Sequence, residues 1–266
     1  MADRNKDVMV FRYDPKKRYF LVSLHLENKP GALGNLANLL AIRGVNILEG
    51  YFGGISSGSK GIASFFLEST NQQLDEGWIK DFLTSSVYVS DVEVKSGVEG
   101  FLTDSLNFPI TWNNGDRAIL MRVEGLRVML DAVKSASSNT GEAEIYRQGL
   151  TYGIAAWRNL MEIHRPKTKE GFLEMLKIYV STGWGKVDLL DLNPEHLRAR
   201  VKMAEGFESS GLSTGKAECY FIGGHLAGAL TAYFGAEVKA HETKCVSKGD
   251  SHCEFEFSPL FTGSSG

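Results

Sequence analysis

The feature that most constrains the fold of this chain is a pair of cysteines near its end, in the stretch HETKCVSKGDSHCEF at residues 241–255. Cys245 and Cys253 stand on either side of a Gly-Asp turn, and Glu242 comes shortly before the first of them. The segments EVKAHETKCVSKG and HCEFEF predict the two strands of a β-hairpin, which brings both thiols close together. A disulfide and a metal site both fit that local geometry.

The third cysteine, Cys219, stands at the start of a predicted apolar helix, ECYFIGGHLAGALTAYFG. An odd number of cysteines in a chain expected to be cytoplasmic argues against a disulfide framework and leaves metal binding, catalysis or plain burial. A helix packed on the hairpin can bring its first turn beside Glu242, Cys245 and Cys253. Three thiolates and one carboxylate favour Zn²⁺ in a closed, structural site. The alternative is that the cysteines are small buried apolar side chains.

Composition argues against several classes of function. The net charge is −3, the isoelectric point is about 6.1, and no run of about five or more like charges occurs, so direct nucleic-acid binding is not expected. The first residues, MADRNKDVMVFRYDPKKRYF, lack the apolar segment of a signal peptide, and no stretch approaches about 18 uninterrupted apolar residues. We therefore expect a soluble cytoplasmic protein that does not bind a membrane.

A length of 266 residues predicts two domains. Residues 18–94 indicate strands and helices in the order βαββαβ, the ferredoxin-like arrangement. Within it the Gly/Ser-rich segment GGISSGS predicts a hairpin turn, and the helix ALGNLANLLAIRG follows the turn ENKPG. Residues 1–17 are expected to be an N-terminal extension. Residues 95–114 are expected to be a linker whose apolar side chains pack against another part of the protein.

From residue 115 the pattern changes to long helices, which are followed by strands, the apolar helix and the hairpin. Thr168 provides a helix start signal and Gly183 a stop signal. We predict an α+β chain in which residues 115–258 form a domain of helices and antiparallel sheet. Residues 259–266 are expected to be a flexible tail.

The stretch ENKPGALGNLANLLAIRGVNI resembles the opening of an ACT domain, the amino-acid-sensing module of many metabolic enzymes. The resemblance covers residues 18–94. It implies that the Pro-Gly turn and the start of the following helix, at Gly31, Ala32 and Leu33, offer backbone N–H groups to the carboxylate of a ligand.

The same resemblance implies that Asn28 and Asn46 hold an amino acid in a groove between two paired copies of the domain. Their alternative role is to bond the backbone of their own turns. Leu26 stands where the serine-binding members of the family carry a histidine, so the resemblance does not favour serine. We expect a homodimer, because the family pairs and an isolated unit would leave its sheet edges exposed.

The stretch ECYFIGGHLAGALTAYFGAEVKAHETKCVSKGDSHCEFEF resembles the C-terminal core of the 4-vinyl-reductase domain. That domain occurs in archaeal regulators and in the sensor modules of phenol- and xylene-responsive activators, and its fold is related to TRAPP tethering subunits. The resemblance covers residues 115–258 and is strongest over the last forty. It implies that Cys219, Glu242, Cys245 and Cys253 are the ligands of the zinc.

In the aromatic-sensing relatives an apolar pocket between the glycine-rich helix and the sheet holds a small aromatic or hydrocarbon molecule. Gly223, Gly224 and Gly228 clear one side of that helix, so another backbone or a flat ligand can approach it. The candidate pocket residues are Trp157, Trp184, Phe221, His225 and Tyr233, together with Phe172 and Met175. The competing interpretation is that these side chains form the core.

A catalytic function is not favoured, because the sequence has no GxSxG, Walker-type, GxGxxG or HExxH motif in a suitable context. We predict a regulator that binds a small molecule: an amino acid at the ACT pair, an aromatic or hydrocarbon in the second domain, or both. No helix-turn-helix is evident, so its output would pass through a partner protein. The alternatives are an accessory or feedback subunit of a metabolic enzyme, and a scaffold that resembles the tethering subunits.

Overall fold

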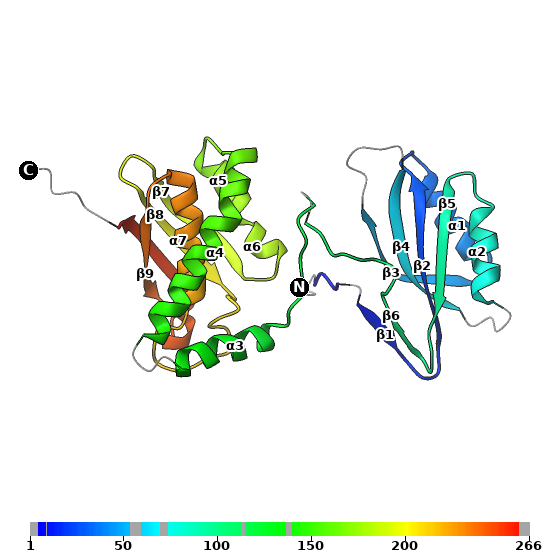
Figure 1. Ribbon diagram of the computed structural model, residues 1–266, viewed down its shortest axis with the longest axis horizontal. Helices are drawn as coiled ribbons and strands as arrows, with labels where there is room; N and C mark the ends of the chain where they lie inside the picture. The colour runs from blue at the N-terminus through cyan, green and yellow to red at the C-terminus, as the bar shows by residue number, and fades with distance from the viewer. Residues whose placement is uncertain are drawn as a thin grey trace, which may run out of the picture. The chain divides into compact units, whose positions relative to one another are not determined.

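The computed structural model describes residues 5–8, 10–53, 60–69, 74–112, 115–136 and 140–260. The chain divides into two compact units, Met1–Ile119 and Leu120–Gly266 (Figure 1). Most of the predicted turn GGISSGS lies outside the described residues, as does the predicted tail beyond Leu260. The prediction of a mixed α+β chain with antiparallel sheets is confirmed.

Unit 1 contains a four-stranded antiparallel sheet in the order β3-β4-β2-β5. Its elements are β1 (Phe11–Tyr13), β2 (Arg18–Glu27), α1 (Ala32–Ile42), β3 (Val45–Gly53), β4 (Lys60–Ser69), α2 (Glu76–Thr84), β5 (Val89–Ser96) and β6 (Phe101–Thr103). From β2 to β5 the elements follow the order strand, helix, strand, strand, helix, strand. The assignment of these residues to a ferredoxin-like ACT domain stays a prediction.

Alternation along β2 explains why this sheet buries both faces. Val22 and Leu24 face the side on which Leu36 of α1 and Ile79 of α2 pack. Leu21 faces the other way, and it is also fully buried. A strand with apolar residues on both faces needs a cover on each side.

The cover on the second face comes from segments that the sequence analysis placed outside the folded unit. β1, from the expected extension, pairs with β6, from the expected linker, and Leu102 of β6 packs with Tyr19, Leu21 and Phe66. Asn107 fastens the following loop, because its side-chain amide donates to Ser64 Oγ at 2.8 Å. The expected linker therefore forms part of unit 1, which extends to residue 119.

Unit 2 is built on a second antiparallel sheet, in the order β7-β8-β10-β9. Its elements are α3 (Val123–Ala136), α4 (Gly141–Ile163), α5 (Lys169–Leu176), α6 (Ile178–Ser181), β7 (Lys186–Asn193), β8 (Arg198–Ala204), α7 (Tyr220–Phe234), β9 (Val238–Lys244), the 3-10 turn η1 (Val246–Lys248) and β10 (Cys253–Pro259). Thr168 caps α5 by accepting the Gly171 N–H at 3.0 Å, as its start signal predicts.

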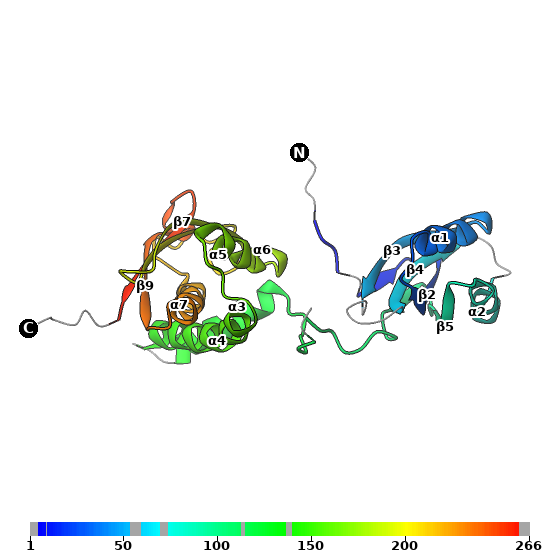
Figure 2. The same ribbon diagram turned by 90° about the horizontal axis from the view of Figure 1, so that it is seen from above.

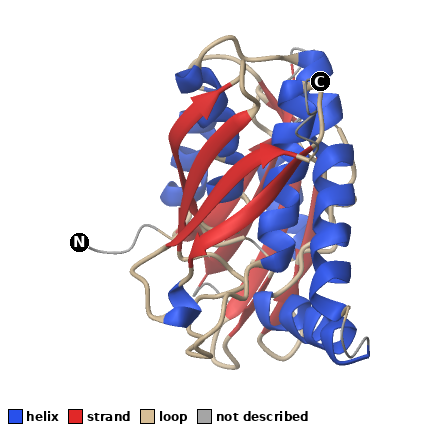
Figure 3. Cartoon of the chain, turned by 90° about the vertical axis from the view of Figure 1, so that its left-hand side faces the viewer, coloured by secondary structure: helices blue, strands red, loops and turns tan. Residues whose placement is uncertain are grey.

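Helix α7 is apolar on all sides because it is enclosed by the sheet and α4 (Figures 2 and 3). Gly224 and Gly228 meet the backbone of α4 and not a flat ligand, whereas Gly223 faces the Phe255 ring, so two of the three glycines follow the first of the two possibilities left open by the sequence. A Cβ atom added to Gly224 would lie 2.1 Å from the Tyr146 carbonyl oxygen of α4. In return, a Cβ atom added to Gly153 of α4 would lie 2.3 Å from the His225 carbonyl oxygen. The two helices therefore cross in direct backbone contact.

Candidate metal centre

The start of α7 places the first member of the cysteine cluster. Cys219 is the N-cap residue of α7, and its backbone N–H donates to Glu242 Oε2 at 3.3 Å. The free N–H groups of the first turn are satisfied from a distance, because the Glu208 carboxylate accepts those of Phe221 at 2.9 Å and Ile222 at 2.8 Å. The position of the Cys219 side chain is thus tied both to the sheet and to the turn that carries Glu208.

The hairpin supplies the other three side chains. Glu242 lies on β9, Cys245 follows the end of that strand, and Cys253 begins β10. The pairing of the two strands shifts register beside Glu254, and the turn is held by the Cys245 N–H, which donates to Asp250 Oδ2 at 2.8 Å. The hairpin of the sequence analysis is confirmed, and a 3-10 turn lies inside its loop.

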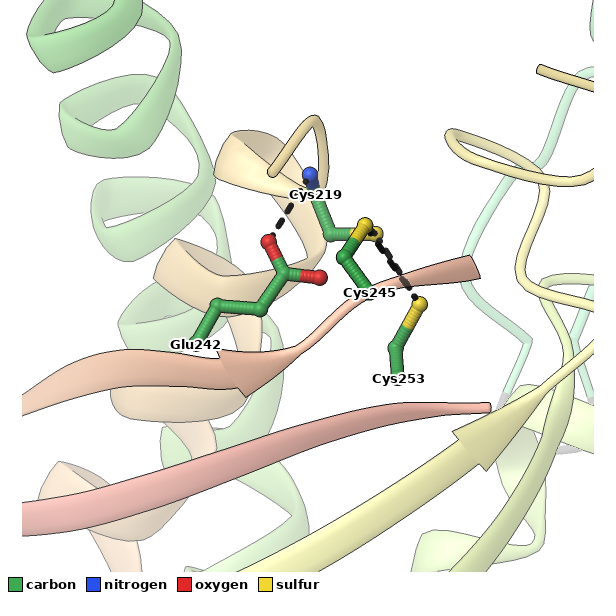
Figure 4. Close-up of side chains that lie close together, drawn as sticks. All are labelled: Cys219, Glu242, Cys245 and Cys253. Carbon is green, nitrogen blue, oxygen red and sulfur yellow. Dashed lines mark hydrogen bonds between the residues drawn. The ribbon is translucent and has the colours of Figure 1, made fainter. Parts of the chain in front are cut away.

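The structure brings together the four residues that the sequence grouped (Figure 4). One ligand atom from each lies within 4.8 Å of all the others. The Sγ atom of Cys219 is 3.8 Å from that of Cys245 and 3.5 Å from that of Cys253, and the last two are 3.9 Å apart. A disulfide would need about 2.05 Å. A tetrahedral metal with Zn–S bonds of about 2.3 Å places its sulfurs about 3.8 Å apart.

Burying three thiols and a carboxyl group together costs free energy unless a cation lies between them. The three thiols are free and buried, and Glu242 Oε1 is a buried atom with no hydrogen-bond partner among the described residues. That oxygen points toward the sulfurs in Figure 4. Burial and the neighbouring Cys245 raise the pKa of Glu242 to about 8, and hydrogen bonds to the other two sulfurs raise the pKa of Cys219. A divalent cation would remove this conflict, so the donor set fits Zn²⁺.

The predicted pocket residues lie in a network of aromatic rings. Trp184 and Phe221 are 5.8 Å apart between ring centroids, and the His225 ring lies 4.6 Å from Trp184. The rings of Trp157 and Tyr179 stack with their centroids 6.0 Å apart. Phe172 links Tyr233 to this network, because its centroid lies 4.3 Å from that of Tyr233 and 5.9 Å from that of Trp157. Met175 is half-buried beside the same core.

Two tyrosines that the sequence did not single out complete this network. The Tyr179 hydroxyl is hydrogen-bonded to His225 Nδ1 at 2.7 Å in a buried position, and burial lowers the pKa of His225 to about 4, so the imidazole is neutral. Tyr152, which is half exposed, packs edge-on against His225. Tyr179 is an ordinary buried aromatic and Tyr152 lies outside the buried stripe of α4, so the sequence offered no signal that singled out either tyrosine.

The residues predicted to bind an amino acid are not brought together within one chain. β2 and β3 both run antiparallel to β4, with Glu27 opposite Lys60 and Asn46 opposite Glu68. Asn28, which follows β2, therefore lies at the opposite end of the sheet from Asn46. Both side chains are exposed. A shared groove would need a second copy, so it stays a prediction.

At the helix start beside Asn28, the three predicted amides differ in exposure. Gly31 is exposed in the left-handed conformation, Ala32 is buried, and Leu33 is 44% exposed. The Ala32 N–H already donates to the Lys29 carbonyl oxygen at 3.2 Å. Not all three backbone N–H groups of the predicted anion site are therefore available to a ligand.

A cavity of about 240 Å³ lies on the second face of the unit 1 sheet, and none of the predicted site residues lines it. It is lined by Ser23, Leu24, His25, Tyr51, Ile62, Asp91, Glu93, Leu106, Asn107, Phe108 and Pro109. Across the described ranges, no helix combines the length and apolar character needed to cross a membrane.

Residues 199–259 match the model of the V4R domain, so the C-terminal part of the chain carries this domain. The match includes all four residues of the cysteine cluster. The uncharacterized protein MJ1642 of Methanocaldococcus jannaschii is 27% identical over 96 residues, which cover 36% of this chain and 57% of that protein. The matched region thus spans little more than half the length of this curated relative.

Three solved structures are similar to parts of the chain. The phenol-responsive sensory domain of the transcription activator PoxR, with phenol, has a TM-score of 0.49 and 22% identity, covering 56% of this chain and 80% of that one. A vinyl-4-reductase family protein from Methanocaldococcus jannaschii has a TM-score of 0.38 and 25% identity, covering 56% and 86%. A trafficking protein particle complex subunit 3 from Naegleria fowleri, covalently bound to palmitic acid, has a TM-score of 0.39 and 13% identity, covering 51% and 93%. Likenesses at this level assign no ligand to the chain.

Proposed function

We propose that this chain is a cytoplasmic regulatory protein that senses a small molecule and whose V4R domain is held together by one structural Zn²⁺. The observation that carries the proposal is the buried convergence of three free thiols with a carboxylate oxygen that has no hydrogen-bond partner among the described residues. The V4R match over the same residues supports it.

The proposed ligands are Cys219, Glu242, Cys245 and Cys253, which join α7 to the β9-β10 hairpin. Four protein ligands would fill a tetrahedral site, so no position is left for a substrate and the role is structural. A bound Zn²⁺ would supply the positive charge that keeps the three thiols and the carboxyl group deprotonated together. Folding of unit 2 would then depend on the metal.

The proposed sensor site surrounds His225. Trp184, Phe221 and Tyr152 offer ring surfaces, while the neutral imidazole and the Tyr179 hydroxyl offer a polar contact in apolar surroundings. Such a combination suits a small aromatic molecule with a hydroxyl group. Because Phe221 and His225 are on α7, ligand and metal would act on the same helix.

For unit 1 the proposal is an ACT-like, ferredoxin-like module that pairs with a second copy. Its element order and sheet order support this, and so does the position of β3 at the sheet edge. An amino acid would then lie between Asn28 of one copy and Asn46 of the other. The output would pass to a partner protein.

Native mass spectrometry of the full chain, purified without chelator, tests the proposal. One zinc per chain together with a small aromatic or hydrocarbon is the expected result. A bound nicotinamide or flavin would favour the enzyme-accessory alternative, and zinc without any small molecule would favour the scaffold. A zinc content well below one per chain, with three freely titratable thiols, would contradict the metal site.

Phenol as a probe tests the sensor site directly. We expect it to raise the melting temperature of the full chain, and Tyr179→Phe to reduce that rise, because the variant loses the hydroxyl bonded to His225. Val87→Ala, on an exposed loop of unit 1, is a matched control that should leave the rise unchanged. An equal rise in the Tyr179→Phe variant would contradict this site.

A further inference from the structure

We propose that Glu208 and Ser209, two neighbouring residues in the turn before α7, are positioning residues of the metal site. The inference rests on the proposed zinc site and extends it to side chains that do not bind the metal. The turn lies between β8 and α7, and neither residue was indicated by the sequence. Both are buried, with Glu208 7% exposed and Ser209 fully covered.

Glu208 holds the end of the helix from which Cys219 projects. Its two carboxylate oxygens accept separate N–H groups, from Phe221 and Ile222, which are the second and third residues of α7. The Cys219 side chain caps none of the described amides, so this distant carboxylate takes the place of a local cap. An acidic group at a helix N-terminus is also favoured by the helix dipole.

Ser209 contacts a different ligand, Cys253 on β10. Its Oγ lies 3.2 Å from the Cys253 Sγ, which also accepts the Val246 N–H at 3.5 Å. A metal-bound thiolate has no proton to give, so in the loaded site the serine hydroxyl is the donor. Neighbouring residues of one turn thus contact two ligand-bearing elements, α7 and β10.

The other hydroxyl near the cluster is differently placed. Ser247 Oγ lies 2.9 Å from the Cys245 Sγ, but it donates its proton to the Lys216 carbonyl oxygen at 2.5 Å. A hydroxyl has one proton, so Ser247 cannot also donate to the sulfur while that bond is kept. Among the described hydroxyl groups that contact the sulfurs, Ser209 is therefore the one with its proton available.

The turn is itself anchored to α3. The Arg127 side chain donates from Nε to the Phe207 carbonyl oxygen and from Nη2 to the Ser210 carbonyl oxygen, both at 2.6 Å. These two carbonyl groups flank Glu208 and Ser209. The side chains that support the ligands are thus held on a turn whose own backbone is fixed by a bidentate contact.

Competition between Zn²⁺ and a chromogenic chelator in the full chain tests this inference. Ser209→Ala and Glu208→Gln should each lower the Zn²⁺ affinity about tenfold to a hundredfold, the range found when partners of metal ligands are removed. Ser258→Ala is the matched control, because it makes the same change on β10 but at the end of the strand away from Cys253. It should leave the affinity unchanged.

Co²⁺ substitution separates positioning from general destabilisation. Ser209→Ala should shift the sulfur-to-cobalt charge-transfer band to lower energy, since the Cys253 sulfur loses a hydrogen bond and becomes a better electron donor. Glu208→Gln should weaken binding without this shift, because Glu208 touches no sulfur. Ser209→Thr keeps the hydroxyl and should retain the original band.

The outcomes distinguish this inference from the proposed function. If the unsubstituted chain binds neither Zn²⁺ nor Co²⁺, the metal site and its positioning residues fail together. If it binds both, while Ser209→Ala keeps its affinity within twofold and its band unmoved, the metal site stands and the role of Ser209 is refuted. An unchanged affinity in Glu208→Gln refutes the role of Glu208 in the same way.

Discussion

The predicted metal site in unit 2 and the predicted amino-acid site in unit 1 differ in whether one chain supplies all of the residues. In unit 2, four side chains from α7, β9 and β10 converge until their ligand atoms lie within 4.8 Å of one another. In unit 1, Asn28 and Asn46 lie at opposite ends of the same sheet. The first site is complete in one copy, whereas the second would exist only between two. Metal affinity should therefore be independent of protein concentration, and an amino-acid response should not be.

The largest effect that tests this contrast is expected from Cys245→Ala. Removing one ligand of a structural metal should destabilise unit 2 by more than about 4 kcal/mol and leave unit 1 folded. Differential scanning calorimetry should show that one of two transitions is lost or strongly lowered. Glu242→Ala should have a milder effect, because water can replace the carboxylate while three thiolates remain. A variant whose two transitions are unchanged would show that the cluster is ordinary core.

A chelator should act on unit 2 alone, and the size of its effect should depend on pH. Without metal, burial raises the pKa of Glu242 from 4.5 to about 8 in the folded chain. The folded chain therefore holds this proton more tightly than the unfolded chain does. The resulting stability is fully present below about pH 4.5 and is lost as the pH rises toward 8. The free energy of zinc binding becomes more favourable as the pH rises, by about 1.4 kcal/mol per pH unit for each proton that the metal displaces. The rise in melting temperature caused by zinc should therefore grow between about pH 5 and pH 8. Melting curves with and without EDTA across this range would measure it, and a flat difference would refute the ligand set.

Two glycine substitutions compare helix packing in the two units. Gly224→Ala should destabilise unit 2 by about 3 kcal/mol, because its Cβ atom would overlap the Tyr146 carbonyl oxygen. Gly34→Ala, in α1 of unit 1, places its Cβ in open space and should stabilise that unit by about 0.5–1 kcal/mol. Urea denaturation followed for each unit would check both signs. Equal effects would mean that the α4-α7 contact is not close.

The smallest effect is expected from Asn46→Ala. Its exposed side chain lies on the edge strand β3, so the stability of the isolated copy should change by less than about 0.5 kcal/mol. Stabilisation by any amino acid that the unsubstituted chain binds should nevertheless be lost. Light scattering alongside a thermal-shift screen of the twenty amino acids would test both points. A monomer at high protein concentration would remove the groove altogether.

Features set by neighbouring residues in the sequence could be predicted, and features set by contacts between distant segments could not. The cysteine cluster could be predicted because metal ligands need particular residue types, and a hairpin with a preceding helix is a local pattern. The pairing of β1 with β6 could not, because each strand has three residues and they come from distant parts of the sequence. The contact of Ser209 with Cys253 was equally invisible, since it depends on where an irregular turn lies in space. A serine there has no periodicity to distinguish it.

The close crossing of α4 and α7 has a consequence for how sequences of this kind can diverge. Gly149 and Gly153 meet the backbone of α7, and Gly224 and Gly228 meet the backbone of α4, so a side chain at any of them has no room unless the partner helix moves. We therefore expect that, among related sequences, these glycines are either all kept or replaced together on both helices. In a distant sequence whose cysteines have been lost, two glycine pairs of this kind would still identify the same helix crossing.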